Sequence, residues 1–98
     1  MLTSKQRAAL RSCANRIEAI FQVGKGGIGD TLIKQVDDAL TARELIKLKV
    51  LENCEYTARE AIEVLAAETN SEPVQVIGNK LVLYRRNPKK PQFDHCLK

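Results

Sequence analysis

The chain has 98 residues, 44% of them apolar and 29% charged, which is enough for one compact core and excludes a disordered segment. No apolar run approaches the roughly 20 residues that a membrane-spanning helix needs, and residues 1–7 (MLTSKQR) lack the apolar core of a signal peptide. We therefore expect one soluble, cytoplasmic domain.

Opposite charges are concentrated in different parts of the chain. Residues 30–72 contain ten acidic and five basic residues, whereas the remainder contains eleven basic and two acidic residues; the net charge is +4. Such a division predicts one basic face for a polyanion and an acidic face turned away from it. A solvated surface of mixed charge is the alternative interpretation.

Metal binding and catalysis have little support in the sequence. Cys13, Cys54 and Cys96 are an odd number with no close pair, and His95 is the single histidine, beside Cys96. These residues predict reduced thiols and no metal site. No nucleophile and base can be assembled around one histidine, so we expect no enzyme activity and no cofactor.

The first half of the chain predicts helix, strand, helix and strand in turn. Thr3 and Gln6 have capping-box spacing, so a helix should begin near Ser4. Residues 19–23 predict a strand, and residues 31–42 a helix with Asp30 as its N-cap. Apolar and polar residues alternate over residues 44–51, which predicts a strand with its lysines on the face opposite the apolar residues.

The second half predicts one helix and a hairpin. A second capping box, Thr57 with Glu60, opens a helix over residues 58–69. Residues 74–78 and 80–85 predict two strands joined by a tight turn at Gly78-Asn79. The order α-β-α-β-α-β-β predicts a single α/β domain with a mixed four-stranded sheet and packed helices. This domain should cover residues 1–86, with residues 87–98 as a basic, flexible tail.

Four of the five glycines lie in residues 24–30 (GKGGIGD), the glycine loop, between the first predicted strand and the second predicted helix. A glycine turn before a helix N-terminus is suited to an anion.

The spacing of the loop glycines matches the dinucleotide pattern GxGxxG, but the chain is too short for a doubly wound domain with a substrate domain. A P-loop is excluded, because no Gly-Lys-Ser/Thr closes the loop. A GxxG clamp on a nucleic-acid backbone at residues 24–27 is favoured, and a purely structural turn stays open.

Several stretches together resemble the CRM domain family (chloroplast RNA splicing and ribosome maturation), in its small stand-alone bacterial YhbY-type form. They are residues 2–7 (LTSKQR) with Leu10 and Arg11, residues 23–27 (VGKGG), Ala39 and Leu40 followed by residues 44–50 (ELIKLKV), residues 74–78 (VQVIG) and residues 81–85 (LVLYR). Two positions depart from the family pattern. Glu18-Ala19 replaces a basic residue and a proline, and Gly29 stands where a threonine often caps the following helix.

The resemblance implies an RNA-binding module that associates with precursors of the large ribosomal subunit. It also implies a fold similar to the C-terminal domain of translation initiation factor three. The expected RNA contacts are the GxxG residues and the basic side chains around them: Gly24, Lys25, Gly26, Gly27, Lys5, Arg7, Arg11, Arg16, Lys47, Lys49, Lys80, Arg85 and Arg86.

A second hypothesis uses the acidic side of the predicted helix 58–69. Glu60, Glu63 and Glu68 face outward there and would suit a basic ribosomal protein or assembly factor. Tyr56 lies in the same acidic neighbourhood, so we expect it to be remote from RNA. With four aromatic residues in the whole chain, a stacking platform is not expected.

Overall fold

A computed structural model describes residues 2–87 of the chain. The order is the predicted one, α-β-α-β-α-β-β. The elements are α1 (Ser4–Ala14), β1 (Ala19–Val23), α2 (Asp30–Arg43), β2 (Leu45–Val50), α3 (Ala58–Thr69), β3 (Glu72–Ile77) and β4 (Lys80–Tyr84). Both predicted capping boxes are present, at Thr3 and Gln6 before α1 and at Thr57 and Glu60 before α3. No helix in the described residues has the length and apolar character needed to cross a membrane.

The four strands form one mixed sheet in the order β1-β2-β4-β3. The pair β1–β2 is parallel, and β4 runs antiparallel to both of its neighbours. The hairpin therefore does not simply extend the sheet, because its second strand is inserted between β2 and β3. This order places the ends of β1 and β2 beside the turn at Gly78-Asn79, where the Val50 amide donates to the Asn79 carbonyl.

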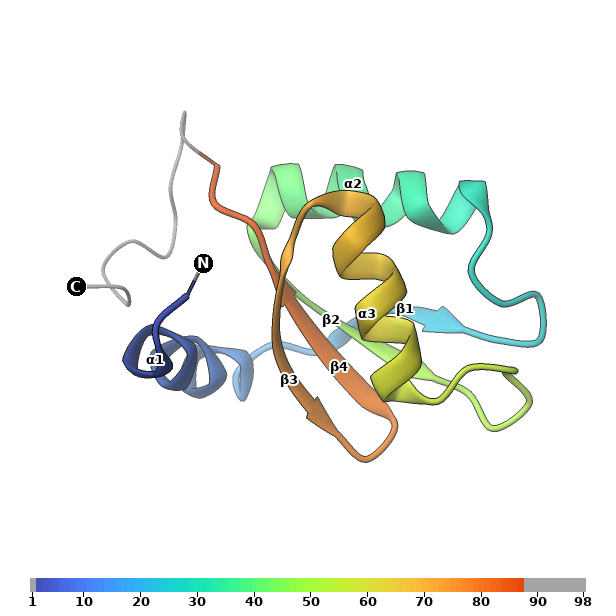
Figure 1. Cartoon of the computed structure of the whole chain (residues 1–98), viewed down its shortest axis with the longest axis horizontal. Helices are drawn as coiled ribbons and strands as arrows, with labels where there is room; N and C mark the ends of the chain where they lie inside the picture. The colour runs from blue at the N-terminus through green and yellow to red at the C-terminus, as the bar shows by residue number, and fades with distance from the viewer. Residues whose placement is uncertain (1, 88–98) are drawn as a thin grey trace.

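The helices cover both faces of the sheet, α2 and α3 on one and α1 on the other (Figure 1). The larger core joins α2 and α3 to the residues of β2 and β4 that face them, such as Val36, Leu65, Leu48 and Leu81. The smaller core joins Leu10 and Ala14 of α1 to Leu45, Val74, Val82 and Tyr84. Because α1 is short, it covers only the part of its face that includes Leu45 and Tyr84.

The two faces of the sheet carry different charged residues. The α1 side carries Lys47 and Lys49, which alternate along β2 with Ile46, Leu48 and Val50 of the larger core. The side of α2 and α3 carries the exposed residues Asp38, Glu60, Glu63 and Glu68.

Both ends of α2 differ from the prediction. Asp30 is the first helical residue and not the N-cap; Gly29 is the N-cap, and no side chain makes a capping hydrogen bond there. Glu44, expected in the next strand, is the C-cap of α2, with a φ of 65° and a fully buried side chain. The left-handed backbone at Glu44 turns the chain directly into β2, so the strand begins one residue later.

The hairpin also differs at its ends. β3 begins at Glu72, two residues before the predicted start, and so includes Pro73. A proline is compatible with this position because β3 is an edge strand with a bulge between Pro73 and Gln75. Beyond β4, Asn87 donates from its backbone to the Glu44 carboxylate and from its side chain to the Thr41 carbonyl. The tail predicted to be flexible, with His95 and Cys96, lies outside the described residues from position 88 on.

Candidate nucleic-acid interface

The GxxG segment is a tight turn at the carboxyl end of β1. The Gly27 amide donates to the Gly24 carbonyl at 2.9 Å, which leaves Lys25 and Gly26 exposed at the tip. Within the described residues, the amides of Lys25 and Gly26 have no protein acceptor. The tip therefore presents two main-chain donors and one ammonium group outward, a combination suited to a phosphate oxygen.

The glycines of this loop have different reasons to be glycine. Gly27 has a φ of 69°, a backbone conformation that side chains with a Cβ rarely adopt. A Cβ at Gly26 or Gly29 would meet nothing within 4 Å, and neither residue has a positive φ. Gly26 is thus not required by the fold, and its missing side chain keeps the tip of the turn open to an approaching ligand.

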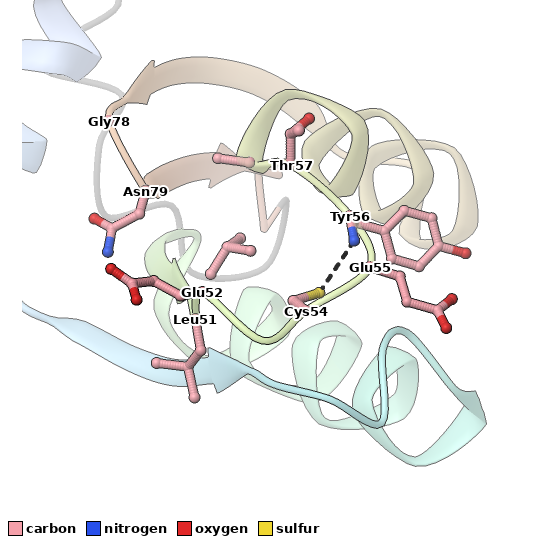
Figure 2. A pocket seen from close by; sticks show the side chains of 10 residues that line it. Leu51, Glu52, Cys54, Glu55, Tyr56, Thr57, Gly78 and Asn79 are labelled. Atoms are coloured by element: carbon pink, nitrogen blue, oxygen red, sulfur yellow. Dashed lines mark hydrogen bonds between the residues drawn. The ribbon is translucent and has the colours of Figure 1, made fainter.

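Tyr56 lies beside this turn, contrary to the expectation that it is remote. A Cβ built on Gly27 would lie 3.6 Å from Cε2 of the Tyr56 ring. The ring is held by a segment between β2 and α3, where the Tyr56 amide donates to the Cys54 sulfur at 3.4 Å (Figure 2). Sequence spacing could not reveal this contact, because parallel pairing of β1 and β2 brings their two following loops together.

The depression next to Tyr56 is acidic and does not suit a phosphate. Figure 2 shows Glu52 beside Asn79 at one side and Glu55 near Tyr56 at the other. Asn53 belongs to the same segment, and its Oδ1 would lie 4.0 Å from a Cβ on Gly24. On the side toward α3 the glycine turn thus has acidic neighbours, which disfavour a polyanion there.

Lysines line that open side. Lys49 is opposite Lys80 in the register of β2 and β4, and Gln22 of β1 is the other neighbour of Lys49. Lys47 occupies the next row on the same face, opposite Val82. Adjacent strands are about 4.8 Å apart, so the row from Gln22 to Lys80 spans about 10 Å beside the end of β1 where the glycine loop begins.

The basic residues of α1 are spread along that helix. Lys5 is exposed in the first turn, and Arg11 is half-buried in the last turn. Arg16 is exposed just after α1, near Asn15, which lines the open sheet face. Arg7 faces another way, since it lines a shallow depression with Arg59 along the outer edge of β3. The first part of α1 and the glycine turn lie at opposite ends of the molecule (Figure 1).

Arg85 and Arg86 lie at the far end of β4 from Lys80. Six residues of extended chain separate Lys80 from Arg86, a span of about 20 Å. The Arg85 guanidinium bonds to Asp37, Thr41 and the Thr69 carbonyl. Arg86 is exposed beside Leu2 and Gln6. The structure thus brings Lys47, Lys49 and Lys80 together on the sheet face beside the end of β1 where the glycine turn begins. It separates them from Lys5, Arg7, Arg85 and Arg86.

A metal centre is not found in the described part of the chain. Between residues 2 and 87, no three residues of the His, Cys, Asp or Glu types are grouped so that they could hold an ion. Cys13 and Cys54 are both present as thiols, each partly buried.

These features are those of a small α/β domain with a basic sheet face and an exposed glycine turn. The chain belongs to the CRS1/YhbY (CRM) domain family, whose model matches residues 2–85. It is 49% identical over 94 residues to the Probable RNA-binding protein YqeI of Bacillus subtilis, covering 96% of this chain and 98% of that protein. An RNA-binding protein of Haemophilus influenzae is 33% identical over 84 residues, covering 86% of this chain and 85% of that protein.

A solved structure agrees with the fold. The solution structure of the hypothetical protein SAV1595 from Staphylococcus aureus superposes with a TM-score of 0.75 at 53% identity. The match covers 88% of this chain and 90% of that one. The α/β architecture and the CRM resemblance inferred from sequence are therefore confirmed.

Proposed function

We propose that this protein binds structured RNA through the phosphate backbone, without catalysing a reaction. The observation that carries the proposal is the juxtaposition of the exposed turn at residues 24–27 with the row containing Lys49 and Lys80. Main-chain donors at the turn and ammonium groups on the sheet face suit successive phosphates along a strand. The RNA-binding names of the family relatives support the same class of partner.

The proposed interface is narrower than the set expected from sequence. It contains the glycine turn (Gly24, Lys25, Gly26 and Gly27) with Lys47, Lys49, Lys80 and Arg16, and Arg11 lies at its border. Lys5, Arg7 and Arg86 would contact only an RNA long enough to extend along α1. Arg85 is left out, because its guanidinium is engaged by groups of the protein itself.

The test is RNA binding measured over a range of salt concentrations. If phosphate contacts dominate, log affinity plotted against log salt concentration should fall with a slope of roughly 0.7–0.9 for each phosphate engaged. Lys25→Glu should weaken binding and lower the slope, because it reverses the charge at the exposed tip. Lys34→Glu, at an exposed position on the α2 side, is the matched control and should change neither value. Salt-insensitive binding, or equal affinities of Lys25→Glu and the wild type, would refute the mechanism.

We further propose that the RNA is ribosomal RNA of the large-subunit precursor and that the protein assists assembly in the cytoplasm. This finer assignment rests on the CRM resemblance. It predicts that the protein sediments with large-subunit precursors, and that crosslinks in cells map to ribosomal RNA at the glycine turn. Crosslinks confined to other RNAs would contradict it.

The competing hypothesis is a protein-binding role for the acidic face of α3. Glu63 and Glu68 are exposed there, but Glu60 accepts from the Thr57 amide and stabilises the helix start. The discriminating variant is therefore Glu63→Gln with Glu68→Gln, leaving Glu60 in place. This double variant should still associate with ribosomes if RNA is the partner. It should no longer associate with them if the partner is a basic protein.

A further inference from the structure

A groove lies on the sheet face beyond the end of α1, where the helix no longer covers the strands. Its lining comes from the end of α1 and from β2, β3 and β4: Asn15, Lys47, Gln75, Ile77, Lys80 and Val82. In the sheet register, Val82 lies between Lys47 and Gln75, and Lys80 is opposite Ile77. The groove is thus built from two adjacent rows of residues that cross the sheet.

The floor of the groove is apolar and its rim is polar. Val82 is almost fully buried, whereas Ile77 is 57% exposed, the one large apolar side chain exposed to that degree among residues 2–87. The side-chain amides of Asn15 and Gln75 have no hydrogen-bond partner within the described chain. An exposed apolar surface between two amides suits a flat group that carries hydrogen-bond donors and acceptors on its edges.

Lysines line the groove and continue toward the carboxyl end of β1, where the glycine turn begins. Lys47 and Lys80 also line a neighbouring depression that runs along β1 past Gln22 and Lys49. Glu18 is the one carboxylate among the residues that line these two hollows. Lys49 and Lys80, one strand spacing of about 4.8 Å apart, therefore provide positive charge between the end of β1 and the groove for an anionic strand.

We infer that this groove accepts an unpaired nucleotide of the RNA bound at the glycine turn. The base rests on Ile77 and Val82, its edge bonds to the amides of Asn15 and Gln75, and its phosphate lies near Lys80. An unpaired nucleobase that is splayed out of a duplex exposes its Watson–Crick and Hoogsteen edges together with its apolar ring face. The inference rests on the proposed function and specifies it: the preferred RNA has an unpaired segment adjoining a helix. An acidic peptide would also match the lysines and is the competing occupant.

The test compares a short blunt RNA duplex with the same duplex carrying a short unpaired extension at its 5′ or 3′ end. The wild-type protein should bind one of the extended duplexes about tenfold more tightly, equivalent to about 1.4 kcal/mol. Asn15→Ala with Gln75→Ala should abolish this preference while leaving the affinity for the blunt duplex unchanged. Gln35→Ala, which removes an exposed amide on α2, is the matched control and should keep the preference. Ile77→Ala, at an exposed site, gives a second variant if the double variant unfolds.

The outcomes separate the inference from the function on which it rests. Equal binding of all three duplexes by the wild type, or a preference that survives in every groove variant, would overturn the inference and leave RNA binding intact. No binding of any RNA would overturn both. Groove variants that bind RNA normally but lose affinity for a polyglutamate peptide would overturn it and assign the groove to an acidic protein.

Discussion

Arg85 and Asp37 are 48 residues apart in the chain and are joined by two hydrogen bonds. Nη1 of Arg85 donates to the Asp37 carboxylate at 2.5 Å, and Nη2 donates to the Asp37 main-chain carbonyl at 2.9 Å. The same guanidinium reaches the Thr69 carbonyl at 2.7 Å. Arg85 therefore ties the end of β4 to α2 and to the last turn of α3, which explains why a basic residue in the predicted RNA-binding set is turned toward the protein.

Replacing Arg85 should affect stability and not RNA affinity. We expect Arg85→Ala to lower the free energy of unfolding by about 1–3 kcal/mol, because carbonyl groups of α2 and α3 lose a charged donor. The ion pair with Asp37 contributes little of this, because the Asp37 side chain is half-exposed to solvent. Urea denaturation measures the change, and Arg43→Ala, at an exposed position in the last turn of α2, is the control with a smaller effect. Weaker RNA binding by folded Arg85→Ala would return this residue to the interface.

Alanine substitutions at two adjacent glycines of the turn should separate an effect on stability from an effect on RNA binding. Gly27→Ala places a Cβ on a residue with a φ of 69°, at a cost of about 1–3 kcal/mol in stability. Gly26→Ala adds its Cβ in open space and should change stability by less than about 0.5 kcal/mol. If RNA phosphates approach the tip, Gly26→Ala should nevertheless weaken RNA binding. Thermal unfolding and RNA titration of both variants check this, and unchanged binding by Gly26→Ala would place the RNA elsewhere.

The local elements could be predicted because their signals are short-range. Two capping boxes located the starts of α1 and α3, and alternation along β2 placed its lysines on one face and Ile46, Leu48 and Val50 on the other. Features that depend on residues distant in the chain could not be predicted from such short-range signals. Glu44 is buried and its carboxylate accepts from the backbone amide of Asn87, and nothing near Glu44 in sequence indicates this bond.

For the candidate site, too, local features could be predicted from the sequence and the contacts between distant strands could not. The glycine turn and the outward position of Lys49 were predicted from spacing and alternation, but the insertion of β4 between β2 and β3 is what brings Lys80 beside Lys49. The same strand order places Ile77 next to Lys80 and so builds the groove. The position of Tyr56 could not be predicted from its acidic neighbours in sequence, because its neighbour in space is Gly27.

The start of α2 offers a stabilising substitution. Gly29 is an N-cap with extended backbone, φ −109° and ψ 178°, and has no side chain to accept from the first helical amides. Gly29→Ser should stabilise the domain by about 0.5–1 kcal/mol, through a capping hydrogen bond and reduced freedom of the unfolded chain. The melting temperature should rise by about 2–8 °C. Gly29→Ala, which lacks a hydroxyl, is the control for the cap; equal gains in both variants would show that the hydrogen bond contributes nothing.

The two capping boxes should contribute to stability with different pH dependence, because one contains Glu60 and the other Gln6. The Thr57 backbone amide, and secondarily its hydroxyl, hold the pKa of Glu60 below its usual value of 4.5. A carboxyl group with a lowered pKa in the folded state stabilises the protein above the pKa of the unfolded state, and this contribution is lost as pH falls through the folded value. The stability difference between the wild type and Glu60→Gln should therefore be constant near neutral pH and shrink as the pH falls below about 4.5.

The capping box of α1 supplies the reciprocal experiment, because Gln6 occupies the position of Glu60 and does not titrate. Gln6→Glu should give that box the same pH dependence as the box of α3, with a gain above about pH 4.5 that disappears in acid. It also adds an acidic residue to a first turn that has none, where the helix dipole favours negative charge. Urea denaturation at a series of pH values measures both variants. A Glu60→Gln difference that stays the same from neutral to acidic pH would show that the Glu60 charge is not stabilised by its bond to Thr57.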